Sequence, residues 1–108
     1  MKCENLEQAR ENIDKIDREI VKLIAERSTY VVQAAKFKNT TDDVKAPQRV
    51  EKIIEKVRNL AKEDDANPDI VENIYREMIN SFINYFAKKK NEQLRINFKF
   101  IQRRFFFT

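Results

Sequence analysis

Apolar residues recur at helical spacing over the first third of the chain, from Leu6 to Lys38. The stripe consists of Ile13, Ile16, Ile20, Leu23, Ile24, Val31 and Ala34. At about 1.5 Å per residue the predicted helix is roughly 50 Å long, which exceeds the size of a compact domain of this length. A helix of that length cannot bury its stripe against its own chain alone. We therefore expect a partner chain.

Two further helical patterns follow a polar loop over 39–46. Pro47 suits the first turn of a second helix, which should end near Lys62. After a polar turn, Asn67 and Pro68 have the residue types of an N-cap and a first helical position. The second helix has apolar residues at Val50, Ile53, Ile54, Val57, Leu60 and Ala61, and the third at Ile70, Val71, Ile74, Tyr75, Met78, Ile79, Phe82 and Ile83. These patterns predict an all-α protein with three helices per chain.

The pattern changes after Phe86. Residues 87–108 hold seven Lys or Arg against one Glu, and five of the eight Phe. Ile96, Phe98 and Phe100 alternate with polar residues, which favours strand over helix. We therefore divide the chain into a helical domain over 1–86 and a basic, Phe-rich tail over 87–108. The net charge of +4 belongs to the tail, so it is weak evidence for nucleic-acid binding by the helical domain.

Three cations continue the apolar stripe of the first predicted helix: Arg10, Arg27 and Lys38. Helical register places Arg27 and Lys38 within roughly 20° of each other and Arg10 about 100° away. A buried cation is costly unless an anion pairs with it, so the three predict a pocket for a small polyanion. The alternative is that the three side chains lie along apolar surface with their charged groups in water.

Composition removes several kinds of chemistry. The chain has no Gly and no His, and Cys3 is its only cysteine. A Gly-rich phosphate loop, a Ser-His-Asp or Cys-His nucleophile, a His-ligated metal and a disulfide framework are therefore excluded. We expect an activity without cofactor or metal. The N-terminus lacks the apolar core of a signal peptide and no run approaches about 18 apolar residues, so we expect a cytoplasmic protein without a membrane partner.

The order of these motifs resembles the all-helical chorismate mutases and the related isochorismate-pyruvate lyases. Arg10 opens the run R-E-N-I-D-K-I-D, Arg27 closes A-E-R, and Lys38 closes A-A-K-F-K. The segments KAPQRVEKII and IVENIYREMINSFINYF are similar to the family's second and third helices. The resemblance covers roughly residues 5–86.

The resemblance implies an intertwined homodimer in which Arg10 reaches the partner's site while Arg27 and Lys38 serve their own. It implies the Claisen rearrangement of chorismate to prephenate, a step of aromatic amino-acid biosynthesis in the shikimate pathway. That reaction needs no metal, nucleophile or general base. Arg10 and Arg27 would bind the two carboxylates, because guanidinium groups grip carboxylates in a fork. Lys38 would donate to the ether oxygen or the nearby carboxylate.

The sequence departs from the family pattern in the second and third helices. Gln48 stands where the family often has a Glu that binds the substrate hydroxyl, and it remains able to accept a hydrogen bond. Pro47 stands where many mutases have an arginine, and a proline there also occurs in the lyase-like branch. Phe86 aligns with a Gln or Glu that donates to the ether oxygen, and phenylalanine has no donor.

Three other functions therefore remain open beside the mutase. Pro47 slightly favours isochorismate-pyruvate lyase activity, which uses the same kind of pocket. Phe86 favours a non-catalytic, mutase-like dimer that binds a ligand without turnover. Nucleic-acid binding by the basic, aromatic tail would have an affinity that falls steeply with salt. For the helical domain itself we expect no nucleic-acid binding.

Overall fold

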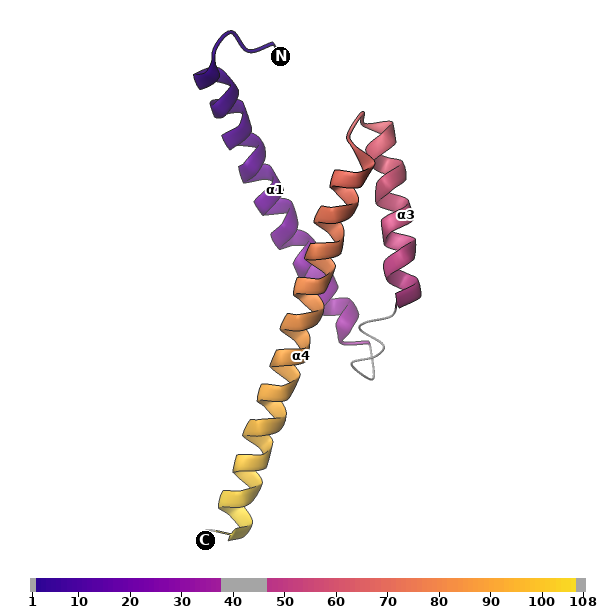
Figure 1. Cartoon of the computed structure of the whole chain (residues 1–108). Coiled ribbons are helices and arrows are strands. Elements are labelled where there is room, and N and C mark those ends of the chain that lie inside the picture. The colour runs from indigo at the N-terminus through magenta and orange to yellow at the C-terminus, as the bar shows by residue number, and fades with distance from the viewer. Residues whose placement is uncertain (1, 38–46, 107–108) are drawn as a thin grey trace. The chain divides into compact units, whose positions relative to one another are not determined.

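A computed structural model describes residues 2–37 and 47–106 of the chain. From Phe86 to Phe106 it describes the side chains of Ala87, Lys88 and Lys89 alone. Every regular element in the described ranges is a helix: α1 (Leu6–Ala35), α3 (Pro47–Glu63) and α4 (Pro68–Phe106), as Figure 1 shows. The predicted all-α class is confirmed. The chain divides into two compact units, Met1–Asn39 and Thr40–Thr108, which we describe separately.

The first unit consists of α1 and its short N-terminal lead. Asn5 caps the helix, since its side-chain oxygen accepts a hydrogen bond from the Gln8 amide at 2.8 Å. The helix ends at Ala35, three residues before the predicted end at Lys38. The amide of Phe37 donates to the Ala34 carbonyl at 3.1 Å, a three-residue spacing that tightens the last turn and closes the helix. Lys38 and the predicted loop over 39–46 lie outside the described residues.

The apolar stripe of α1 is not buried within the first unit. No residue of α1, all of which the structure describes, is buried. Ile16 is 58% exposed, and Ile20, near the middle of the stripe, is 47% exposed. Exposed apolar surface of this extent is typical of a face that another chain covers. The homodimer expected from the sequence stays a prediction.

The second unit is built on a hairpin of α3 against the first half of α4 (Figure 1). Its core is formed by Ile54, Val57 and Ala61 of α3 with Ile79 of α4. These four residues all belong to the predicted apolar stripes, so helical spacing identified the packed faces correctly.

The turn between α3 and α4 forms without glycine. Asp65 takes the left-handed conformation, with φ of 57°. The Ala66 amide donates to the Ala61 carbonyl at 2.8 Å, and the Asp65 amide donates to the Lys62 carbonyl at 3.4 Å. This pair of hydrogen bonds is the Schellman pattern, in which glycine usually occupies the left-handed position. Aspartate tolerates that conformation better than most residues.

The start of α4 follows the prediction. The side-chain oxygen of Asn67 accepts hydrogen bonds from the amides of Asp69 at 2.8 Å and Ile70 at 3.4 Å. Asn67 is thus the N-cap, and Pro68 takes the first helical position, where its missing N–H costs nothing.

The second half of α4 corrects the sequence analysis. The alternation of Ile96, Phe98 and Phe100 indicated a strand, but the helix runs without a break to Phe106. The alternating run spans only five residues, too few to outweigh its surroundings. It follows a stretch over 87–95 with three Lys, one Glu and one Gln, which are good helix formers, and no Gly or Pro interrupts the segment.

Candidate active site on the helical domain

One uninterrupted helix, α1, carries the two arginines of the predicted site. Arg10 is exposed and makes no ion pair with any side chain that the structure describes. Arg27 is half-buried, although no residue of α1 is fully buried. Helical register sets their directions about 100° apart, so the two cannot grip one small ligand from the same side of one helix. Lys38, the third predicted cation, lies outside the described residues.

The second unit has a shallow cavity, widely open to solvent, where α3 begins. Its volume is about 400 Å³. It is lined by Pro47, Val50 and Glu51 of α3 and by Asn80 and Ile83 of α4.

Two residues predicted from the sequence belong to this end of the hairpin. Gln48 is exposed in the first turn of α3, directly after Pro47, but it does not line the cavity. Phe86 follows Ile83 by three residues, which is less than one turn of α4. The backbone therefore brings the positions of Gln48 and Phe86 to the same end of the hairpin.

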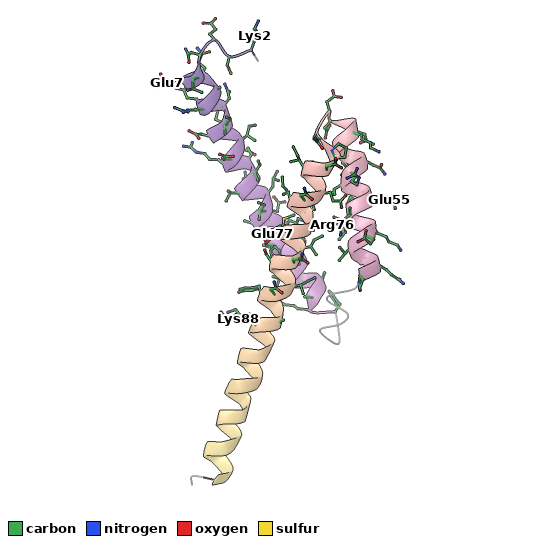
Figure 2. All side chains as sticks on the ribbon, viewed as in Figure 1. Lys2, Glu7, Glu55, Arg76, Glu77 and Lys88 are labelled. Carbon is green, nitrogen blue, oxygen red and sulfur yellow. The ribbon has the colours of Figure 1, made fainter. Side chains whose placement is uncertain are left out.

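Five charged residues join α3 to α4 along the hairpin, from Glu51 at the cavity to Asp69 at the start of α4. Arg76 donates from Nη1 and Nη2 to the two carboxylate oxygens of Glu51, at 3.1 and 3.2 Å. Its Nε donates to Glu72 at 2.7 Å. Arg58 donates to Glu72 at 2.8 Å and to Asp69 at 2.9 Å. Figure 2 shows Arg76 on the side of α4 that faces α3. The network fixes the register of the two helices.

The network shifts the pKa values of three of its members, Glu72, Arg58 and Arg76. The hydrogen bond from Arg76 is the main cause that holds the pKa of Glu72 below its ordinary value of 4.5. The bond from Arg58 acts in the same direction, and desolvation opposes both. The hydrogen bonds to Asp69 and Glu72 raise the pKa of Arg58, and those to Glu51 and Glu72 raise the pKa of Arg76. Both arginines therefore stay charged.

Comparison with known proteins places these features in a family. The family model described as chorismate mutase type II matches residues 9–86, which cover most of α1, all of α3 and the first half of α4. The chain belongs to the type II chorismate mutase family. The resemblance inferred from the sequence is confirmed.

The curated relatives of this chain carry the names of different activities. The chain is 32% identical over 81 residues to the isochorismate pyruvate lyase of Pseudomonas aeruginosa, over 75% of this chain and 80% of that protein. It is 35% identical over 77 residues to the chorismate mutase of Methanocaldococcus jannaschii, over 70% and 78% of the two proteins. It is 31% identical over 91 residues to a bifunctional chorismate mutase/prephenate dehydratase of Aquifex aeolicus, of which the match covers 25%.

Sequence reasoning missed Asn80 and Glu51 in this family member. Both line the cavity, yet they are far apart in the sequence and neither continues an apolar stripe. Only the pairing of α3 with α4 brings them together. The Glu51–Arg76 pair had no local signal either, because opposite charges on different helices follow no sequence period.

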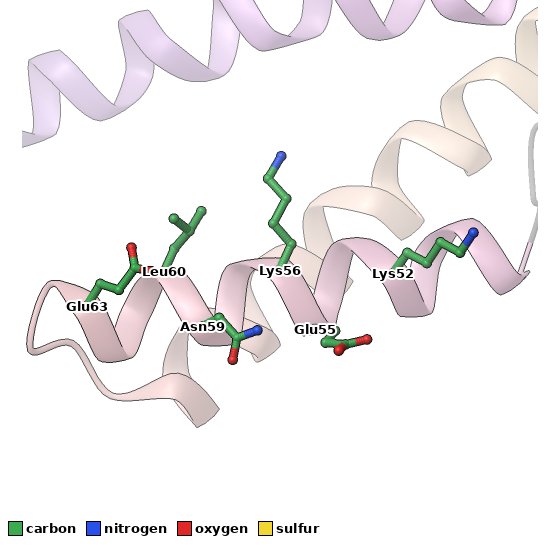
Figure 3. Close-up of a pocket in the computed structure, with 6 residues that line it drawn as sticks. All are labelled: Lys52, Glu55, Lys56, Asn59, Leu60 and Glu63. Atoms are coloured by element: carbon green, nitrogen blue, oxygen red, sulfur yellow. The ribbon is translucent and has the colours of Figure 1, made fainter.

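A second depression, of about 410 Å³, is lined by α3 alone. Its lining consists of Lys52, Glu55, Lys56, Asn59, Leu60 and Glu63. Figure 3 shows that Lys56 and Leu60 project to one side of the helix and Asn59 to the other, so these side chains do not converge. With two cations balanced by two anions, the surface has the character of a solvated helix face, and we assign no site to it. Among the described residues, no helix is long and apolar enough to cross a bilayer.

Proposed function

We propose that this chain is a chorismate mutase that rearranges chorismate to prephenate, with a rate lowered by Phe86. The observation that carries the proposal is the continuous α1 that bears both Arg10 and Arg27, in a chain whose match to the family spans residues 9–86. The chorismate mutase of Methanocaldococcus jannaschii supports the choice of substrate.

The site is proposed to form between two copies of the chain. Arg27 and Lys38 serve the site of their own chain, and Arg10 reaches the site of the partner. The different directions of Arg10 and Arg27 around α1 support this division. So does the open stripe of α1, which a second copy would cover.

Each residue has a role that its chemistry allows. Arg10 and Arg27 each bind one carboxylate of the substrate in a fork, which holds the dicarboxylate in its folded, reactive conformer. Lys38 donates to the ether oxygen or to the carboxylate near it, where charge develops as the bond breaks. Gln48 accepts a hydrogen bond from the substrate hydroxyl.

Phe86 removes one donor from this arrangement. Loss of a single donor to developing charge costs about 10²–10³ in rate. The test is prephenate formation from chorismate by the parent chain and by Phe86→Gln and Phe86→Glu. We expect a gain of at least about tenfold in one of the two variants. Phe82→Gln, one turn earlier on α4, is the matched control and should bring no gain.

A result without turnover would have a definite meaning. If the parent and all variants leave chorismate unchanged while circular dichroism shows the helices intact, the mutase proposal is wrong. Binding of chorismate that depends on Arg10 and Arg27, without turnover, would then identify a non-catalytic, mutase-like dimer.

A second candidate is cleavage of isochorismate to salicylate and pyruvate. The observation that favours it is Pro47, which begins α3 and lines the cavity where many mutases have an arginine. The similarity to the isochorismate pyruvate lyase of Pseudomonas aeruginosa supports it. Assay of both substrates with the same preparation separates the two, because the favoured activity is the one with the larger kcat/KM.

A further inference from the structure

The cavity at the start of α3 has a charge of the wrong sign for the ligand that we propose. Among the described residues that line it, Glu51 alone is charged; the others are Pro47, Val50, Asn80 and Ile83. Chorismate carries two carboxylates, and like charges at close range repel each other. An uncompensated carboxylate at this position would therefore oppose the binding of a dianion.

Arg76 provides the compensating positive charge from the neighbouring helix. Its Nη1 and Nη2 donate to the two carboxylate oxygens of Glu51 at 3.1 and 3.2 Å, so each oxygen has a charged donor. Arg76 does not line the cavity, but it lies four residues, about one turn of α4, before Asn80, which does. The fork thus pairs the carboxylate at the edge of the cavity and leaves the pair without net charge.

The Arg76 guanidinium is held in place from its own helix. Its Nε donates to Glu72, four residues earlier on α4, at 2.7 Å. Glu72 is in turn bound by Arg58 at 2.8 Å. With Nε engaged on α4, Nη1 and Nη2 remain for Glu51 on α3, and Figure 2 shows Arg76 on the side of α4 that faces α3. Both the charge and its direction are therefore fixed before a ligand arrives.

The paired carboxylate lies close to positions of the proposed site. Glu51 follows Gln48 by three residues on α3, which is less than one turn. On α4, the position of Phe86 follows the cavity residue Ile83 by the same interval. A change in the charge of Glu51 would therefore act on a ligand bound at this end of the hairpin.

We propose that Arg76 is a positioning residue of this site, which admits a dianionic ligand by cancelling the charge of Glu51 and fixing its carboxylate. The inference rests on the proposed function, because it takes chorismate as the ligand. Arg76 acts through Glu51 and does not touch the substrate. The charge that it cancels is felt equally by the substrate and by the transition state, so its removal changes KM and leaves kcat nearly constant.

The test measures KM and kcat for chorismate in the Phe86→Gln background, with binding to the slower parent followed by calorimetry. Arg76→Leu leaves Glu51 unpaired and should raise KM by about three- to tenfold, with little change in kcat. Arg76→Lys keeps the positive charge and should regain most of the affinity lost in Arg76→Leu. A purely structural role would instead make KM follow the stability of the hairpin.

Removal of the carboxylate should have the opposite effect. Glu51→Gln breaks the same fork, but it leaves the charge of Arg76 uncancelled beside the cavity, so KM should fall below that of the Phe86→Gln chain. The double variant Glu51→Gln, Arg76→Leu has no charge at either position, and its KM should return close to the starting value. Far-UV circular dichroism checks that each variant keeps its helices.

Arg58→Leu is the matched control. It removes a cation from the same network and changes the net charge equally, but Arg58 follows Glu51 by seven residues, about 10 Å along α3, and bonds Asp69 and Glu72 instead. Its KM should stay within about twofold of the starting value, since the screening length is about 10 Å at 0.1 M salt.

Salt provides a further readout that packing would not affect. The Glu51 side chain is 65% exposed, so dissolved ions reach it. The ratio of KM in Arg76→Leu to KM in the Phe86→Gln chain should shrink between about 0.1 M and about 1 M salt, because the screening length falls from about 10 Å to about 3 Å.

Three results would overturn the inference and leave the proposed function in place. They are equal KM values in Arg76→Leu and Arg58→Leu, a KM in Arg76→Lys as high as in Arg76→Leu, and a rise of KM in Glu51→Gln. Absence of chorismate binding in both the parent and the Phe86→Gln chain is a different result. It would refute the proposed function, and this inference with it.

Discussion

Arg76 holds Glu51 in a fork across the α3–α4 hairpin. Its Nη1 and Nη2 donate to the two carboxylate oxygens at 3.1 and 3.2 Å, and Glu51 also lines the cavity beside the start of α3. Parallel hydrogen bonds of this kind restrict both distance and orientation. The pair therefore connects the packing of the hairpin to the shape of the candidate site.

Replacing Arg76 by lysine should lower the stability of the hairpin although the charge remains. A lysine ammonium cannot make the planar fork to Glu51 while also bonding Glu72. The urea midpoint of Arg76→Lys should fall below that of the parent, and Arg76→Leu should fall further. Arg49→Lys on the exposed surface of α3 is the matched control, and an equal fall there would show that the fork contributes nothing specific.

Acid should weaken the hairpin through Glu72. Because bonding to Arg76 and Arg58 lowers its folded pKa, its contribution is present above the ordinary pKa of 4.5 and is lost as pH falls through the lower folded value. Urea midpoints measured from neutral pH to about pH 2 should decline across that window. In Glu72→Gln the decline should be smaller. Glu55→Gln, which removes an exposed carboxylate outside the network, is the control for the loss of one charge on the surface. Identical profiles for the parent and Glu72→Gln would contradict the assignment.

The small core of the second unit should be sensitive to truncation. Ile54 is 4% exposed between α3 and α4, so Ile54→Ala removes buried methyl groups and leaves a cavity. We expect a loss of about 2–4 kcal/mol in the free energy of unfolding. Leu60→Ala, on the same helix but 44% exposed, should cost less than about 1 kcal/mol. Urea unfolding followed by circular dichroism measures both, and similar losses would mean that α3 does not pack as described.

The three helices and their inner faces could be predicted because helical period and capping are local signals. Pro47, Asn67 and Pro68 marked helix starts to the residue. Features that depend on two helices at once could not be predicted from the sequence. Examples are the pairing of Arg76 with Glu51 and the cavity beside Asn80. Among the predicted site residues, Arg10, Arg27 and Gln48 lie within the described helices, and their meeting in one site stays a prediction.

The strand expected around Phe98 was wrong, although it also rested on a local pattern. A five-residue alternation is a short signal, and the helix propensity of the longer segment outweighed it. The end of α1 before Lys38 was missed because its closing three-residue hydrogen bonds have no sequence signature.

Glycine at the α3–α4 turn should stabilise the protein. Asp65 adopts a left-handed backbone with φ of 57°, which costs an L-residue conformational energy that glycine does not incur. Asp65→Gly should therefore raise the free energy of unfolding by about 0.5–1 kcal/mol. Among the described residues, the adjacent Asp64 does not have a positive φ, so Asp64→Gly should not stabilise. A loss of stability in Asp65→Gly would indicate that the Asp65 side chain contributes more than its conformation costs.

Mixed dimers should reveal whether Arg10 acts across the two chains. In the Phe86→Gln background, Arg10→Ala and Arg27→Ala should each abolish most mutase activity, because each removes a fork to a carboxylate. When the two variants are unfolded together and refolded, a mixed dimer has one site with every residue intact. Random pairing makes about half of the dimers mixed, so about a quarter of the parent activity should return.

The pairing of Arg27→Ala with Lys38→Ala is the matched control. Both residues are assigned to the site of their own chain, so a mixed dimer of these variants has a defect in each site and should stay inactive. Recovery with Arg10→Ala but not with Lys38→Ala would establish that Arg10 is supplied by the partner. Failure of both mixtures, with dimers confirmed by sedimentation, would place Arg10 in its own chain's site, and its direction on α1 would then need another explanation.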